Sequence, residues 1–296
     1  ICSLVAVPVI WFLMDNAMKA ADAGSAHDAA AGGIVGFIMG QPLLGQIMFG
    51  VYILAMVGLP IWALAGLDKD ARSKLIVAVV LCFFSVVFWT LFEQAGSSLT
   101  LFAERNTDRM IGSYEMPAGQ AQAFNPVFIV VMAPLFSLMW NWLGSRKLEP
   151  SVPFKFTIAL ALVGIGFLAL VFGAQFHNAQ FQVALFWLAL AYFIHSVGEL
   201  CISPVGLSMI TKLSPAKMVG LMMGVWFMSS AMAQYAGGII AQFASTETVG
   251  GQVLNPEVSL NTYLGVFQTI GIAGLICAGV LLLLSPFLQK GMGGVR

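Results

Sequence analysis

Two glutamates interrupt apolar stretches that are otherwise long enough to cross a bilayer. Glu93 lies in the run from Phe88 to Ser98, and Glu199 lies in the run from Gly198 to Gly206. An ionised side chain near the bilayer centre costs about 2.5–3.5 kcal/mol on insertion scales, so such residues usually face a water-filled cavity or a partner. No predicted span has an internal Lys or Arg that could neutralise either carboxylate. We therefore interpret both glutamates as functional residues that lack a countercharge within this chain.

Helical spacing gives each glutamate polar or aromatic neighbours. Residues four apart share a helix face, which predicts three polar faces on three helices: Trp89, Glu93 and Ser97; His195, Glu199 and Ser203; Trp226, Ser230 and Gln234. Three such faces could line a cavity. The alternative is that the Ser, Gln and Trp side chains only form hydrogen bonds between helices.

Two further polar features have competing interpretations. Asn125 precedes Pro126 at the start of a span, so its amide either faces the cavity or caps the helix. His195 and Glu199 have the spacing of two metal ligands, but no third ligand accompanies them, so we predict no metal. G-x-S-x-G, H-E-x-x-H and G-x-x-x-x-G-K-[ST] patterns are absent from the sequence, as is a cysteine–histidine nucleophile pair. We therefore predict neither enzymatic activity nor a cofactor.

Composition and hydrophobic runs predict an all-α, polytopic membrane protein. Hydrophobic residues make up 59% of the 296 residues and charged residues 9%, and a spanning helix needs about 20 apolar residues. The net charge of zero gives no reason to expect nucleic-acid binding. An apolar helix is expected to end near residue 14, and spans are predicted at 42–66, 75–103, 124–144, 153–175, 181–210, 218–244 and 262–288. Pro204 should bend its helix just after Glu199.

The basic residues predict the orientation of these spans. Ten of the 13 Lys and Arg residues fall in one set of alternate connections and the tail: Lys69, Arg72, Lys74, Arg146, Lys147, Lys155, Lys212, Lys217, Lys290 and Arg296. The other set has Lys19, Arg105 and Arg109. The positive-inside rule makes the first set and the C-terminus cytoplasmic, which puts Glu93 in the outer half of its helix.

Three segments resemble the C-terminal half of the proton-coupled oligopeptide transporters, a branch of the major facilitator superfamily. They are FWTLFEQAGSSLTLFAERNTDR (88–109), Asn125-Pro126 and HSVGELCISPVGLSMITKLSPAKMVGLMMGVWF (195–227). The resemblance implies a major-facilitator-type six-helix bundle over residues 68–296. Residues 1–67 resemble the extra helix pair, with its periplasmic connection, that bacterial members insert between their two bundles.

The resemblance also implies a function and roles for individual residues. The expected activity is proton-coupled symport of dipeptides and tripeptides across the bacterial inner membrane. Glu199 would bind the peptide's amino terminus beside the Asn125 amide, Glu93 would couple protonation to a salt bridge with the other bundle, and the side-chain pocket would include Trp89, Trp226 and Ser230.

Other interpretations remain open at this stage. The chain starts at Ile1 without a Met, which favours a piece of a longer protein, and the N-terminal bundle with its E-x-x-E-R-F motif and basic residues is not in the sequence. We therefore expect this chain to need that bundle as its partner, besides the peptide, protons and lipid bilayer, and not to transport by itself. A carrier for another small solute, such as a drug or an anion, is the alternative function. A membrane scaffold or receptor is less favoured, because it would have little reason to keep two intramembrane glutamates.

Overall fold

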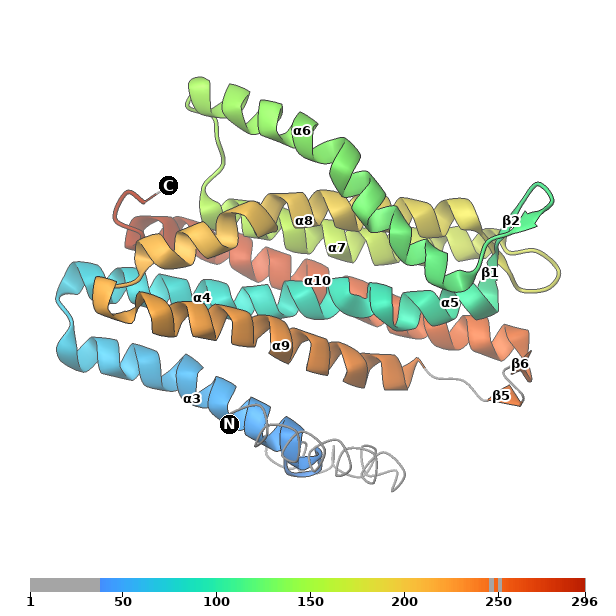
Figure 1. Cartoon of the computed structure of the whole chain (residues 1–296), viewed down its shortest axis with the longest axis horizontal. Coiled ribbons are helices and arrows are strands. Elements are labelled where there is room, and N and C mark those ends of the chain that lie inside the picture. The colour runs from blue at the N-terminus through green and yellow to red at the C-terminus, as the bar shows by residue number, and fades with distance from the viewer. Residues whose placement is uncertain (1–37, 245–247, 250–251, 296) are drawn as a thin grey trace, which may run out of the picture. The chain divides into compact units, whose positions relative to one another are not determined.

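The computed structural model describes residues 38–244, 248–249 and 252–295, and long helices account for most of them (Figure 1). Within these residues, seven helical segments are long and apolar enough to cross a membrane. The helices are α3 (Leu43–Gly66), α4 (Lys69–Phe92), α5 (Ser98–Asn106), α6 (Phe124–Ser145), α7 (Val152–Gly173), α8 (Leu185–Leu213), α9 (Val219–Phe243) and α10 (Pro256–Gly291). Short 3₁₀ helices are η2 (Glu93–Gly96), η3 (Ala118–Ala123), η4 (Ala174–Phe176) and η5 (Ala216–Met218). The six predicted spans that follow the Lys69–Lys74 cluster are therefore confirmed.

The chain divides into two compact units between Trp62 and Ala63, and each is described by itself. Most of α3 lies in the first unit. The first helix of the predicted pair and its periplasmic connection fall in residues outside the described part of the chain. The second unit holds α4 to α10 and contains every predicted site residue.

Local sequence signals fix where two of these helices begin. The Asp68 carboxylate caps α4 by accepting a hydrogen bond from the Ala71 amide. The Asn255 side chain accepts from the amides of Glu257 and Val258, and Pro256 occupies the first turn of α10. A polar cap accepts hydrogen bonds from backbone amides that have no partner within the helix. Proline has no amide hydrogen, and at the first turn its absence removes no helical hydrogen bond.

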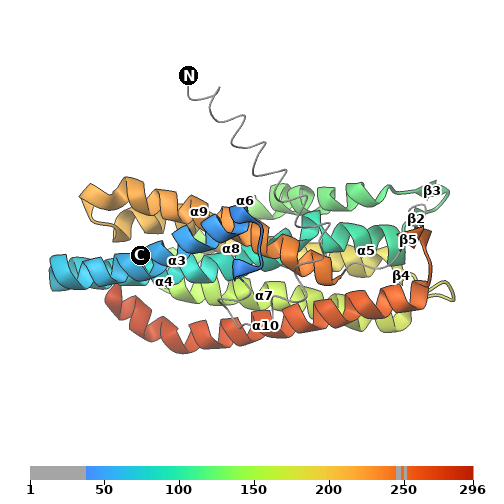
Figure 2. The ribbon, with the colours of Figure 1, turned by 90° about the horizontal axis from the view of Figure 1, so that it is seen from below.

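Within the second unit, α7 lies between α8 and α10, and α4 packs against α9. Figure 2 shows α7 and α10 running side by side. Their backbones come close because Gly164 faces Gly271, and a Cβ on Gly164 would lie 2.7 Å from the Gly271 carbonyl oxygen. Small residues at such positions are typical of helices that approach closely. Gly220 and Gly224 have a similar spacing of small residues, but a Cβ added to either would have no neighbour within 4 Å in the described chain.

Three pairs of short strands connect helices in the described part of the chain. β1 (Thr107–Asp108) pairs in parallel with β4 (Val183–Ala184); β2 (Met110–Ile111) with β3 (Tyr114–Glu115) and β5 (Thr248–Val249) with β6 (Gln252–Val253) form antiparallel pairs. Beside β1, the buried Asn106 amide donates hydrogen bonds to the carbonyl oxygens of Phe181 (3.1 Å) and Pro256 (3.0 Å), and its oxygen accepts one from Ser259 (2.7 Å). This one side chain therefore ties α5, α10 and the connection before α8 together.

One predicted helix is not continuous. The sequence predicts a single helix from residue 75 to 103, whereas the structure has α4, then η2, then α5. Ser97, at the junction, has φ −131° and ψ −96°, outside the helical region. α8 stays helical from Leu185 to Leu213 through Pro204, so no break follows Glu199, and the predicted bend is not tested. The break in the backbone lies at Ser97, after the 3₁₀ turn that starts at Glu93.

Candidate functional site

Glu199 and Asn125 form a direct contact between α8 and α6. The Asn125 side-chain amide donates hydrogen bonds to a Glu199 carboxylate oxygen and to the Ser196 hydroxyl oxygen, each at 3.0 Å. Ser196 is itself held by donating to the Tyr192 carbonyl oxygen in the preceding turn. Asn125 is the second residue of α6, and its side chain reaches α8, so the helix-cap interpretation was wrong. The amide orients the carboxylate, which stays partly exposed and has acceptor sites left for a ligand.

His195 does not share the surface of Glu199. The imidazole is 1% exposed, its Nε2 lies 3.1 Å from the Val163 carbonyl oxygen, and its ring lies 4.7 Å from the ring of Phe167. Both neighbours belong to α7, whereas Glu199 faces Asn125 on α6. A step of four residues turns about 40° around a helix, and this was enough to place the two side chains against different helices. The four-residue spacing on α8 is as predicted, but the two side chains contact different helices.

Glu93 lies where α4 gives way to η2, and the polar residues around it hold the break in place. Gln94 is fully buried; its amide donates to the carbonyl oxygens of Thr90 and of Gly237 on α9, and its oxygen accepts from Ser98. These contacts replace helical hydrogen bonds that the break removes. The Glu93 carboxylate itself has no hydrogen bond among the described residues and is partly exposed, so it is available to another group.

Two buried polar atoms on either side of Glu93 lack partners. Neither Nε1 of Trp89 nor Oγ of Ser97 has a hydrogen-bond partner among the described residues. Leaving a buried donor unsatisfied costs about 1–3 kcal/mol, so such atoms mark places where a ligand or another protein surface could supply the bond. Trp89 and Ser97 therefore have unused hydrogen-bonding capacity, whereas their predicted common face with Glu93 is not tested by any contact.

No ion pair involves Glu93 or Glu199 in the described part of the chain. Lys155, near the start of α7, is a buried cation with only 5% of its surface exposed. Its ammonium pairs with Glu149 and lies 4.5 Å from the centre of the Trp140 ring. Lys155 is thus already engaged and does not neutralise the glutamates.

The remaining predicted site residues lie on α9 and differ in exposure. Trp226 is 7% exposed, and a Cβ on Gly206 would overlap its ring, so the indole packs directly on the α8 backbone. Ser230, one turn further, is partly exposed, and Gln234 is exposed. The structure joins Asn125 and Glu199 by a hydrogen bond. No hydrogen bond in the described part of the chain joins Trp226 to either of them. The predicted pocket role of Trp226, Trp89 and Ser230 is not tested by these contacts.

The helix that carries Asn125 is open to solvent or to another surface. No residue of α6 is buried, and its helical contacts within the unit are chiefly with α8 and η3. Figure 1 shows the second half of α6 leaning away from the other helices of the unit. Asn125 contacts α8, and the rest of this helix leaves its apolar surface available to whatever completes the site.

Sequence reasoning missed several residues that matter to this geometry. Ser196 helps to fix Asn125, and Gln94 fixes the break beside Glu93. Tyr192 supports the same region, because its hydroxyl donates to the Ala95 carbonyl oxygen just after Glu93. The sequence did contain a signal for Gln94 and Ser98. Buried polar side chains need hydrogen-bond partners, so two polar residues four apart in an apolar run could have been predicted to bond to each other or to a neighbouring helix.

The sequence matches a known protein family. The model of the POT family matches residues 52–255, more than two thirds of the chain. The chain belongs to the POT family. Dipeptide and tripeptide permease A of Edwardsiella piscicida is 38% identical over 224 residues, which are 76% of this chain and 45% of that protein. An uncharacterized transporter of Bacillus subtilis is 37% identical over 228 residues, 77% of this chain and 43% of that protein.

Solved structures show the same fold. A crystal structure of the peptide transporter POT in complex with sulfate is similar with a TM-score of 0.75 and 29% identity, covering 99% of this chain and 53% of that one. The predicted all-α, major-facilitator-type fold is therefore confirmed, and this POT-family chain is a multi-pass membrane protein. The chain spans about half the length of the curated relatives it matches.

Proposed function

We propose that this chain forms the peptide-binding and proton-coupling half of a symporter for dipeptides and tripeptides in the bacterial inner membrane. The observation that carries the proposal is the Asn125–Glu199 contact, a part-buried carboxylate oriented by an amide from a second helix, in a chain of the POT family. Similar proteins include those named dipeptide and tripeptide permease A.

In this proposal Glu199 binds the positively charged amino terminus of the peptide. A carboxylate is an acceptor-only group that suits an ammonium, and the hydrogen bond from Asn125 leaves further lone pairs on Glu199 free for it. Trp89, Trp226 and Ser230 form the adaptable part of the pocket, in which aromatic area accommodates varied side chains. A second bundle of helices supplies the opposite wall, facing the open side of α6.

Glu93 carries the proton in this proposal. Its carboxylate lies at a break in the backbone, without a hydrogen bond or countercharge among the described residues, so its protonation state depends on what approaches it. A basic residue of the other bundle would favour the charged form, and withdrawal of that residue would favour the protonated one. Movement of the bundles and proton binding are thereby coupled.

Vesicles reconstituted with the full-length protein test this assignment. We expect wild-type protein to accumulate a dipeptide when an inward proton gradient is applied. Glu93→Gln, which resembles the protonated form permanently, should lose gradient-driven accumulation and keep exchange of external for internal peptide. Glu115→Gln is the matched control, because Glu115 is an exposed carboxylate at the end of the bundle.

Each outcome of this experiment is informative. Proton-driven accumulation by Glu93→Gln would exclude Glu93 from coupling, and loss of exchange as well would make it a binding or folding residue. Wild-type vesicles that ignore dipeptides but accumulate a drug or an inorganic anion would replace the peptide proposal with the alternative carrier function.

A further inference from the structure

An open hollow lies at the end of the bundle where α4 begins and α10 ends. It has a volume of about 500 Å³ and is lined by Lys69, Asp70, Ser73, Phe287, Lys290 and Gly291. Ligand pockets commonly measure about 300–1,000 Å³, so the space is sufficient for a small polar group. Gly291 lets α10 approach α4 closely beside the hollow, because a Cβ there would lie 2.8 Å from Val77 and 3.1 Å from the Ser73 hydroxyl.

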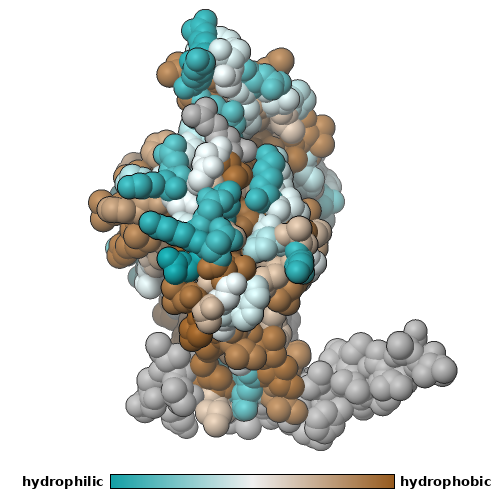
Figure 3. Space-filling view, turned by 90° about the vertical axis from the view of Figure 1, so that its left-hand side faces the viewer, coloured by the Kyte–Doolittle hydropathy of each residue, from teal (hydrophilic) through white to brown (hydrophobic). Residues whose placement is uncertain are grey.

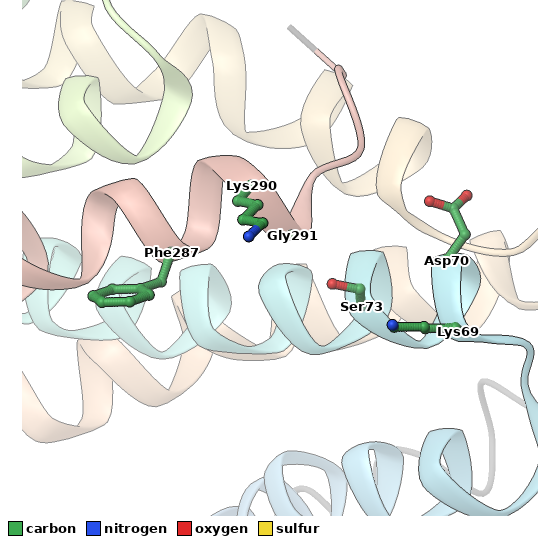
Figure 4. A pocket seen from close by; sticks show the side chains of 6 residues that line it. All are labelled: Lys69, Asp70, Ser73, Phe287, Lys290 and Gly291. Atoms are coloured by element: carbon green, nitrogen blue, oxygen red, sulfur yellow. The ribbon is translucent and has the colours of Figure 1, made fainter.

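The charges around the hollow favour an anion. Lys69 and Lys290 are exposed, and neither forms an ion pair among the described residues. The one acidic lining residue, Asp70, is already paired with Lys74 at 2.6 Å. Figure 4 shows the Lys290 ammonium pointing from α10 toward α4 and the Lys69 ammonium directed along α4 toward Ser73. Two ammonium groups and a hydroxyl are the donors that phosphate oxygens accept from.

An apolar surface continues from the same hollow. Phe287 lines it and is 73% exposed, and Leu283, one turn earlier on α10, is 74% exposed. Residues at this spacing share a helix face, so an apolar track leads from the lysines toward the middle of the span. A ligand that filled both parts would have an anionic head and an apolar tail. Inorganic phosphate would use only the first part.

The position of the hollow in the membrane agrees with such a ligand. Figure 3 looks onto the end of the molecule where α4 begins, and hydrophilic side chains gather on this end between apolar flanks. The distribution of Lys and Arg predicts that this end faces the cytoplasm. Anionic lipids act on that side of a membrane, and basic pockets between spanning helices bind their headgroups.

We propose that the hollow between α4 and α10 binds one anionic phospholipid, with the headgroup phosphate held by Lys69, Lys290 and Ser73 and an acyl chain lying along Phe287 and Leu283. The site is separate from Glu93 and Glu199, so the proposal is independent of the peptide-transport proposal. A bound lipid would contact both the first turn of α4 and the last turn of α10, which are the first and last helices of the second unit.

Lipid binding to the purified protein tests the proposal. Native mass spectrometry in detergent would measure the affinity for phosphatidylglycerol and for zwitterionic phosphatidylcholine. We expect tighter binding of phosphatidylglycerol, and a loss of about fivefold in Lys290→Gln or Lys69→Gln, since each lysine near a membrane surface contributes about 1 kcal/mol toward an anionic lipid. Lys290→Arg should retain binding. Lys217→Gln is the control, because Lys217 is an exposed lysine in the connection before α9.

A second comparison separates a lipid from free phosphate. Phe287→Ala should weaken phosphatidylglycerol binding and leave any binding of inorganic phosphate unchanged. Because Phe287 and both lysines are exposed, these substitutions should not disturb folding, and helical content by circular dichroism checks this. Equal affinity of the wild type and both Lys→Gln variants for phosphatidylglycerol would overturn the proposal. So would displacement of the lipid by inorganic phosphate together with no effect of Phe287→Ala, which would indicate a free-phosphate site.

Discussion

Replacing Glu199 with glutamine tests the proposed peptide site most directly, because the change removes a charge and keeps the shape. The Asn125 amide donates to one oxygen of Glu199 at 3.0 Å, and a glutamine oxygen at the same place can accept that bond. The contact between α8 and α6 should therefore survive. The substitution removes only the carboxylate charge, which in this proposal binds the ammonium group of the peptide.

The size of the effect follows from the burial of Glu199. Breaking a buried, hydrogen-bonded charge pair costs about 2–5 kcal/mol. Glu199 is partly exposed, so water reduces the loss and we expect the lower end, about 2–3 kcal/mol. That loss raises the dissociation constant of a dipeptide about 30- to 150-fold.

Isothermal titration calorimetry on the full-length protein can measure this loss with two controls. Glu257→Gln removes an exposed carboxylate from the first turn of α10 and should leave affinity unchanged. An N-acetylated dipeptide has no ammonium, so its weaker binding should be the same for the wild type and for Glu199→Gln. An equal loss for free and acetylated dipeptides would show that Glu199 does not bind the amino terminus, and unchanged affinity for the free dipeptide would refute the assignment outright.

Two further predictions concern packing and stability. Trp226→Ala should weaken binding of peptides with bulky side chains more than binding of dialanine, whereas an equal loss in a competition assay across all peptides would indicate only the lost packing on Gly206. Asn106→Ala removes three hydrogen bonds between buried or partly buried groups, each contributing about 1 kcal/mol. We expect the variant to be destabilised by about 3 kcal/mol, seen as a lower unfolding temperature in detergent; an unchanged temperature would mean that water replaces Asn106 at no cost.

The sequence alone was sufficient to predict the spans and to single out two carboxylates within them. In lipid, a backbone can satisfy its own polar groups only within helices or closed barrels, so apolar length translates directly into helices such as α7 and α10. The same environment makes Glu93 and Glu199 conspicuous, since few charges can be tolerated there without a purpose.

Only the tertiary structure decided which partner each polar side chain takes. The helix breaks beside Glu93 without a proline there, and next to the break the Gln94 amide donates to the Gly237 carbonyl oxygen on α9. The His195 imidazole contacts the Val163 carbonyl oxygen on α7, and the Asn125 amide donates to Glu199 on α8 and does not cap its own helix. The physical reason is that helical periodicity gives the direction of a side chain only to within a turn, whereas hydrogen bonds depend on atoms contributed by helices far away in the sequence.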